Sequence, residues 1–225
     1  MDMTATVDNL HHAYAEPSSL HTPLNIPLRE ALRSFATSQS FLFSEDNAGN
    51  TYITRRGQDL GLAPIAIAFP LDGGLSETSF ASALRVFMLY SEVDLPCDLM
   101  LVGWTHMGSR LVGREIWEAS ATASGLGDTP PELERFKGME SPQGASVSAI
   151  FEICEQAGTL RIEGSPVLID QTRKLVAVPA DFYESTKLGS RAPWISIMGP
   201  GAESVSRSAI QNYSAYIVAL FDNFD

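Results

Sequence analysis

Three runs of sequence decide the fold that we predict: residues 83–90, ALRVFMLY; residues 98–105, DLMLVGWT; and residues 110–118, RLVGREIWE. Each run is rich in β-branched, aromatic and other apolar residues. Turn-forming residues separate them, with Pro96 before the second run and Gly108 before the third. Three such runs at a spacing of about a dozen residues are typical of strands in a β-sandwich or barrel.

Further strand patterns lie on both sides of this block. In residues 63–70, APIAIAFP, the large side chains Ile65, Ile67 and Phe69 share one face, and alanines occupy the other. Runs of the same kind occur at 52–54, 147–153, 167–169, 175–178, 194–198 and 214–221. We therefore predict an all-β fold, a single jelly-roll β-sandwich of about eight strands over residues 41–225.

The N-terminal residues 1–40 are predicted to form an extended arm with a short helix. Residues 1–25 are polar and irregular, and they contain no Lys or Arg. Pro27 then opens a helical pattern over 28–35, in which Leu28, Leu32 and Phe35 fall on one face. Such an arm cannot repay its backbone entropy alone, so we expect neighbouring chains to order it.

Composition narrows the classes of function. The chain has 225 residues and a net charge of −12, which disfavours a surface-wide attraction to nucleic acid. No apolar run approaches the roughly 18 residues that cross a bilayer, and the start of the chain lacks the pattern of a secretory signal. Cys97 and Cys154 form no disulfide framework and are expected to be buried thiols. We expect a soluble protein of intracellular origin.

A search for catalytic, cofactor-binding or metal-binding patterns yields none. His11, His12 and His21 lie in the irregular arm, and His106 lies beside Trp104 at a predicted strand end, where a structural role is expected. The sequence has no Gly-x-Ser-x-Gly elbow and no His-x-x-x-His or Cys-x-x-Cys pair. We therefore predict no catalytic residue, no cofactor and no metal, and a protein that is not an enzyme.

Two parts of the chain carry a resemblance to a known family. Residues 98–108 are similar to the mid-barrel strand of coat proteins from small icosahedral positive-strand RNA viruses, the picorna-like group. Residues 175–183, 194–201 and 213–221 resemble the C-terminal strands of the same proteins in layout. Within this group the mass of 24.4 kDa is similar to that of the small coat proteins of plant-infecting secovirids of the cheravirus-like kind.

The resemblance implies a structural protein of the virion. It would assemble in the host cell cytoplasm, with copies of itself and sister coat proteins, into a large symmetric shell around an RNA genome. Contact with genomic RNA would be weak at most, because residues 1–25 lack basic side chains. No contact with a membrane is implied.

Two other classes of protein fit the same pattern. One is a soluble β-sandwich binding module for a carbohydrate or protein ligand, without catalysis. The other is an enzyme on a β scaffold that uses acidic residues of the long loop 119–145, such as Glu132 and Glu134. Light scattering would separate a shell from a small module, and alanine at His106 and at the loop carboxylates would test the enzyme.

Overall fold

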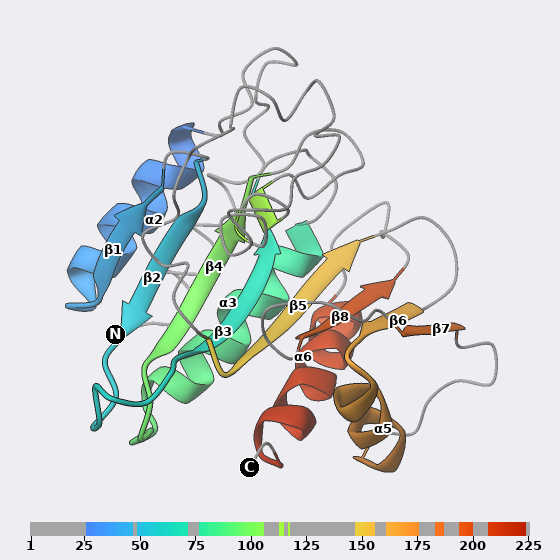
Figure 1. Cartoon of the computed structure of the whole chain (residues 1–225). Coiled ribbons are helices and arrows are strands. Elements are labelled where there is room, and N and C mark those ends of the chain that lie inside the picture. Colours follow the sequence, from blue (N-terminus) through green and yellow to red (C-terminus); the bar gives the residue numbers. More distant parts are fainter. Residues whose placement is uncertain are drawn as a thin grey trace, which may run out of the picture.

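The chain forms a mixed α/β structure with one eight-stranded sheet (Figure 1). This computed structural model describes residues 26–46, 49–71, 77–105, 113, 114, 117, 147–155, 161–175, 183–186, 194–199 and 207–223. The strands are β1 (Leu42–Glu45), β2 (Thr51–Arg55), β3 (Ile65–Pro70), β4 (Leu99–Trp104), β5 (Ala149–Glu155), β6 (Arg161–Gly164), β7 (Tyr183–Thr186) and β8 (Trp194–Gly199). The helices are α2 (Ile26–Ser38), α3 (Glu77–Ser91), α5 (Pro166–Leu175) and α6 (Arg207–Phe221).

Four parallel strands form the middle of the sheet. The strand order is β1-β2-β4-β3-β5-β8-β6-β7, and β4, β3, β5 and β8 all run in the same direction. The hairpin β1–β2 pairs antiparallel with β4 on one side, and β6 pairs antiparallel with β8 on the other. All six residues of β4 are buried, as expected of a parallel strand that is covered on both faces.

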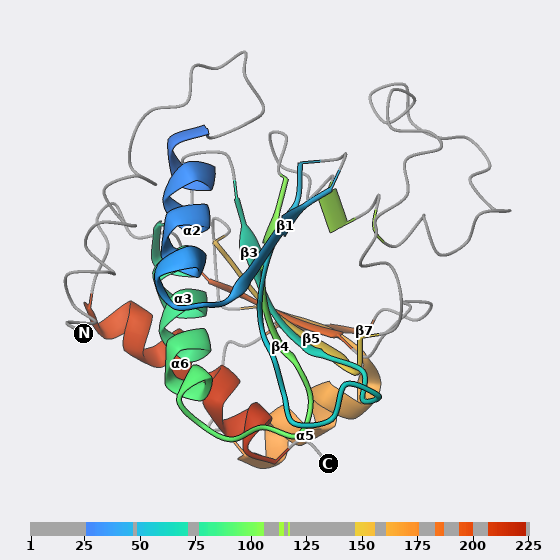
Figure 2. The ribbon, with the colours of Figure 1, turned by 90° about the vertical axis from the view of Figure 1, so that its left-hand side faces the viewer.

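Side chains that alternate along each strand point to opposite faces of the sheet and contribute to two separate hydrophobic cores. On the first face, Ile67 and Phe69 of β3 and Phe151 of β5 pack with the inner sides of the helices. Figure 2 shows α2, α3 and α6 together on this side of the sheet. On the second face, Ala66 and Ala68 of β3 lie among larger side chains. These are Tyr52, Met100, Val102, Trp104, Trp117, Val147, Ile150 and Trp194.

The run at 83–90, which we predicted to be a strand, lies inside helix α3. Arg85 and Leu89 are its exposed positions, and the other six residues of the run are buried. Exposed positions four residues apart follow the period of a helix, not the period of two of a strand. A short apolar run cannot distinguish a buried strand from a buried helix, and here the length of 15 residues decides for the helix.

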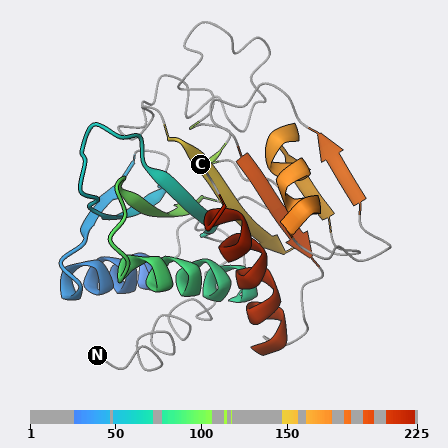
Figure 3. The same cartoon turned by 90° about the horizontal axis from the view of Figure 1, so that it is seen from below.

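Three other predicted strands are also helical where the structure describes them. Residues 214–221 belong to α6, where Ser214, Ile217 and Leu220 are buried at a spacing of three. Residues 167–169 belong to α5, which packs near β6, β7 and β8 (Figure 3). Residues 113, 114 and 117 of the predicted strand 110–118 are helical as well.

The prediction of an all-β jelly roll is therefore wrong. Strands were predicted correctly at 52–54, 65–69, 99–104, 149–153 and 194–198, and so was the helix over 28–35. The error came from apolar helices that cover one face of the sheet, because their buried sides resemble strands in composition. The predicted arm 1–25 and the whole loop 119–145 lie outside the described residues, and the division at residue 40 stays a prediction.

Among the helices that the structure describes, none is both long and apolar enough to span a bilayer.

A tyrosine hydroxyl ties the C-terminal helix to α3. The Tyr90 hydroxyl donates a hydrogen bond to Asp222 Oδ1 at 2.5 Å, and its ring stacks on Phe221 with centroids 4.1 Å apart. Burial, together with this hydrogen bond and the negative charge of Asp222, raises the pKa of Tyr90 above its ordinary value. The contact therefore favours the protonated phenol in the folded state.

We expect Tyr90→Phe to lower the free energy of unfolding by about 1 kcal/mol at neutral pH, because one partly buried hydrogen bond is lost. The pKa of Tyr90 is raised on folding. Its contribution is therefore complete below the pKa of an unfolded tyrosine, about 10, and disappears as pH rises through the higher folded value. Urea unfolding of both proteins at neutral pH and above pH ~10 should show the difference shrinking at high pH. Tyr216→Phe, on α6, is the control, and an equal loss in that variant would contradict the role of the hydrogen bond.

Candidate functional site

At the carboxyl ends of β3 and β4, two neighbouring parallel strands are followed by connections that cross opposite faces of the sheet. After β3 the chain passes to α3 on the first face of the sheet. After β4 it passes to the second face, where Trp117 and Val147 are buried. Neighbouring parallel strands whose connections leave to opposite faces open a gap at their carboxyl ends, and in open α/β sheets ligands bind there. We therefore take the carboxyl ends of β3 and β4, which we call the switch point of the sheet, as the candidate site.

The backbone is closely held at this point. Beyond the last pair of β3 and β4, the Leu71 amide still donates to the Trp104 carbonyl at 2.8 Å. The Gly113 amide donates to the Thr105 carbonyl, also at 2.8 Å. Thr105 and Gly113 therefore lie side by side at the carboxyl end of β4, and we call this pair the stem.

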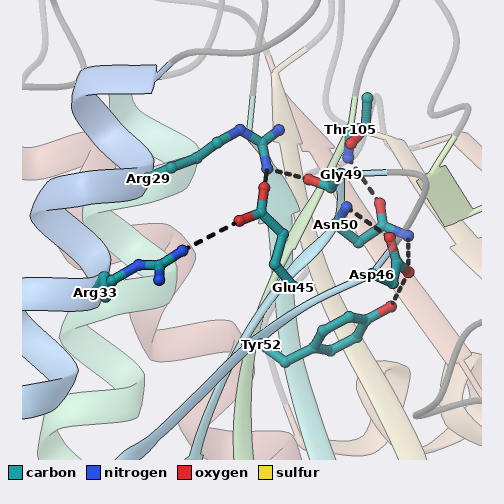
Figure 4. A network of polar contacts seen from close by, with 8 residues as sticks. All are labelled: Arg29, Arg33, Glu45, Asp46, Gly49, Asn50, Tyr52 and Thr105. Atoms are coloured by element: carbon teal, nitrogen blue, oxygen red, sulfur yellow. Dashed lines mark hydrogen bonds and ion pairs between the residues drawn. The ribbon is translucent and has the colours of Figure 1, made fainter.

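The side chain of Asn50 joins both residues of the stem, and Figure 4 shows its contact with Thr105. Its Oδ1 accepts a hydrogen bond from the Thr105 amide at 2.9 Å. Its Nδ2 donates to the Gly113 carbonyl at 3.1 Å and to Asp46 Oδ2 at 2.9 Å. Asn50 is 0% exposed, and these contacts use the carbonyl oxygen and both amide hydrogens.

Gly113 is required by this close approach. A Cβ atom at residue 113 would lie 1.8 Å from Asn50 Oδ1 and 2.6 Å from the Thr105 nitrogen. Neither neighbour is the end of a flexible side chain, since Asn50 is held on all sides and the other atom is backbone. A larger residue at 113 would therefore force the stem apart.

The turn of the β1–β2 hairpin positions Asn50. Asp46 accepts hydrogen bonds from the Asn50 amide, the Asn50 side chain and the Tyr52 hydroxyl at 2.9, 2.9 and 2.8 Å. Gly49 adopts a positive φ of 84°, and its amide donates to the Asp46 carbonyl at 2.9 Å. Because β2 runs antiparallel to β4, this turn lies at the carboxyl end of β4. The sequence EDNAGN thus gives more than a turn, since it supplies the polar side chains of the site.

Helix α2 braces the same turn from the first face. The buried Arg29 guanidinium pairs with Glu45 at 2.9 Å and donates to the Gly49 carbonyl. Arg33 also approaches Glu45, at 3.6 Å (Figure 4). Its guanidinium lies over the Phe43 ring at 4.9 Å. The hairpin is therefore fixed to a helix as well as to the sheet.

A second polar cluster lies on the second face, one residue beyond the stem. Arg114 Nη1 lies 3.0 Å from both carboxylate oxygens of Glu152 on β5. The Ser196 hydroxyl on β8 donates to Glu152 Oε1 at 2.9 Å, and the Arg114 guanidinium stacks over Trp194 at 4.5 Å. Glu152 is only 1% exposed, so its charge depends on these partners for compensation. The cluster holds the chain after the stem against the middle of the sheet.

Aromatic side chains complete the second face near the stem. Trp104, the last residue of β4, meets Tyr52 edge to face at 6.4 Å and Trp117 at 5.9 Å between ring centroids. Trp104 and Trp117 are both buried. Their rings pack residue 117 against β4, which adds an apolar anchor to the polar one at Arg114.

The thiol of Cys97 lies at the other end of the sheet. Cys97 precedes β4, so it is near the amino ends of the parallel strands, and it is buried. Burial raises the pKa of its thiol, which disfavours the reactive thiolate. It is therefore not a candidate nucleophile for this site.

The described residues do not form a metal site. In the described ranges no group of three or more His, Cys, Asp and Glu side chains is placed to hold a metal ion. Asp46 and Glu152 are instead occupied by hydrogen-bond donors of the protein. We therefore derive no chemical step through a metal from these residues.

The predicted absence of site residues is not tested by the structure. His11, His12, His21 and His106 lie outside the described residues, as do Glu132 and Glu134 of the alternative enzyme hypothesis. Sequence reasoning missed the buried hydrogen bonds of Asn50 with Asp46, Thr105 and Gly113, which we call the polar frame. One signal was available: Glu152 interrupts an apolar strand pattern on the same face as Ile150, which is unusual for a buried strand.

Three solved structures that are similar in fold to this chain are hydrolases by name. The chain covers 96% of a Burkholderia cenocepacia protein classed as an amidohydrolase/peptidase, with 96% of this chain aligned, 12% identity and a TM-score of 0.64. A hydantoinase/carbamoylase family amidase from Burkholderia ambifaria matches with 97% and 94% coverage of this chain and that chain, 10% identity and a TM-score of 0.60. The LapA aminopeptidase of Legionella pneumophila matches with 96% and 68% coverage, 12% identity and a TM-score of 0.55.

These likenesses establish the fold and nothing finer, because the identities are low. No family model matches the sequence, and no curated protein matches it. The chain spans about half, 49%, of the length of another solved structure, AtUAH. The activities of these proteins therefore come to this chain only as a proposal.

The comparisons overturn the predicted function. The neighbours are amidohydrolase-, peptidase- and aminopeptidase-type enzymes and not viral coat proteins, so the predicted coat protein, its virion location and its shell of sister subunits are wrong. The alternative hypothesis of a β-sandwich binding module is also wrong, because the described strands form one mixed sheet and not a β-sandwich. The prediction that the chain is not an enzyme is contradicted, since three solved structures similar in fold are named as hydrolases. An α/β sheet, unlike a jelly roll, places its functional end at the carboxyl ends of parallel strands.

We expect Arg114→Met to lower the free energy of unfolding by about 3–5 kcal/mol, because it removes the salt-bridge partner of the buried Glu152. The double variant Arg114→Met/Glu152→Gln should lose clearly less, since the buried charge is removed with its partner. Urea unfolding of both single variants and the double variant gives the coupling energy. Lys174→Met, which breaks the exposed pair with Asp170, is the control and should leave the free energy of unfolding nearly unchanged, because solvent screens an exposed pair. Additive effects of the two substitutions would contradict a coupled pair.

Proposed function

We propose that the chain hydrolyses an amide bond, as a peptidase or an amidase. The observation that carries this proposal is the buried polar frame around Asn50, which lies at the switch point of a sheet shared with three hydrolases. The names of those neighbours, an amidohydrolase/peptidase, an amidase and an aminopeptidase, all denote cleavage of bonds between carbon and nitrogen.

The location of the frame supports the proposal independently of the names. Buried polar side chains cost free energy unless they are hydrogen-bonded, and apolar residues would fill the same space more cheaply. Asp46, Asn50 and Thr105 are buried together at the carboxyl ends of β3 and β4, where the topology of an open α/β sheet favours ligand binding. This position favours a role in holding reacting groups over a role in stability alone.

The described residues supply the support of such a site and not its reacting groups. Asn50, which Asp46 holds in place, fixes Thr105 and Gly113 at the carboxyl end of β4. Arg114 and Glu152 fix the next residues on the second face. Catalysis of amide hydrolysis depends on alignment to within a fraction of an ångström, and rigid supporting contacts provide it.

The test is a panel of amide substrates offered to the purified full chain. Aminoacyl p-nitroanilides, dipeptides and N-carbamoyl amino acids report peptidase and amidase activity, and release of the amine is measured. We expect turnover of at least one class. A folded wild-type protein that hydrolyses none of them, with or without added divalent metal salts, would contradict the proposal.

Gly113→Ala should lower kcat/KM by about tenfold or more, because a Cβ atom there displaces Asn50 or Thr105 and shifts the stem. Gly61→Ala is the matched control. Gly61 lies in an exposed loop, where a Cβ atom meets only the Asp59 side chain at 3.2 Å, so its activity should equal that of the wild type. Steady-state kinetics on the best substrate of the panel checks both. An unchanged kcat/KM for Gly113→Ala would separate the stem from catalysis.

A further inference from the structure

We propose that Asn50 is a positioning residue for the reaction, and this inference rests on the proposed amide-bond hydrolysis. Its role would be to hold Thr105 and Gly113 at a fixed separation. The backbone of the stem would then keep one geometry at the switch point. Asn50 would act through the backbone and would not touch the substrate.

Asn50 is suited to this role because its amide group bonds three separate segments. The carbonyl oxygen receives the Thr105 amide, and the amide nitrogen serves the Gly113 carbonyl and the Asp46 carboxylate. The partners also fix the orientation of the amide, since a backbone N–H requires the oxygen and the two acceptors require the nitrogen. A flipped side chain would face every partner with the wrong atom.

Asp46 in turn prevents the side chain of Asn50 from rotating. Its Oδ1 accepts a hydrogen bond from the Asn50 backbone amide. Its Oδ2 accepts hydrogen bonds from the Asn50 side-chain amide and from the Tyr52 hydroxyl. Asp46 is 7% exposed, so these donors stabilise its charge with little help from water. The stem is thereby connected to a turn that α2 and β2 already hold in place.

Asn50→Asp is the sharpest test because it preserves shape and changes chemistry. The acceptor for the Thr105 amide remains, but an oxygen replaces the nitrogen that faces the Gly113 carbonyl and Asp46. The stem should open more often, and the Gly113 amide should exchange its hydrogen about tenfold faster or more in NMR-detected exchange. In the same variant kcat should fall about tenfold while KM changes less, because alignment is lost rather than substrate binding.

A compensating change provides the rescue. Asp46→Asn combined with Asn50→Asp exchanges the amide and the carboxylate between the two positions, so one donor and one acceptor face each other again. We expect partial recovery of kcat and of slow Gly113 exchange, since the Gly113 carbonyl still faces an oxygen. If the single variant does not fold, this double variant, compared with the wild type, carries the test.

Asn223→Asp is the matched control, because it makes the same chemical change at an exposed asparagine whose side-chain amide donates to the Ala219 carbonyl at 2.8 Å, far from the stem. It should leave kcat and Gly113 exchange unchanged.

The outcomes separate the two proposals. A wild-type protein without any turnover refutes the proposed function, and the exchange of Gly113 then still decides whether Asn50 holds the stem. An active wild type with unchanged kcat and unchanged Gly113 exchange in Asn50→Asp refutes the positioning role. Faster exchange with unchanged kcat also refutes it, because the stem would then be irrelevant to the reaction.

Discussion

The constraint on which this structure depends is that its parallel strands must be covered on both faces. Strand β4 has no exposed residue, and β3 is buried along all but its first residue. Parallel strands cannot be joined by tight turns, so each connection must cross a face of the sheet. The first face receives three helices and a large apolar core, while the described part of the second face has a smaller core built around tryptophans (Figure 2).

The location of the candidate site follows from this covering. Connections after β3 and β4 leave to opposite faces, and the chain must separate at that point. A gap between two strand ends exposes backbone groups that need partners. Thr105 and Gly113 satisfy one such pair with each other, and Asn50 satisfies the next. The polar frame is thus the physical solution to a problem that the topology creates.

The sequence predicted the sheet better than the fold. Ile65, Ile67 and Phe69 alternate as a strand should, and β3 was recognised. The same criterion failed for Val86 and Phe87, because a helix that packs on a sheet is also apolar over several consecutive residues. The site was out of reach for another reason. Asn50 and Gly113 are 63 residues apart, and only the pairing of β2 with β4 brings them together.

The distribution of buried polar groups distinguishes a functional frame from ordinary core chemistry. Two buried hydroxyls on the described helices bond to their own helix, since Ser91 donates to the Met88 carbonyl and Thr172 to the Leu168 carbonyl. Such bonds are local and add no long-range order. The buried carboxylates Asp46 and Glu152 instead bond across distant segments at the carboxyl end of β4 and on the second face. Buried charges in these positions lower stability, but they permit only one arrangement of their partners. A site that must align a substrate benefits from a single arrangement.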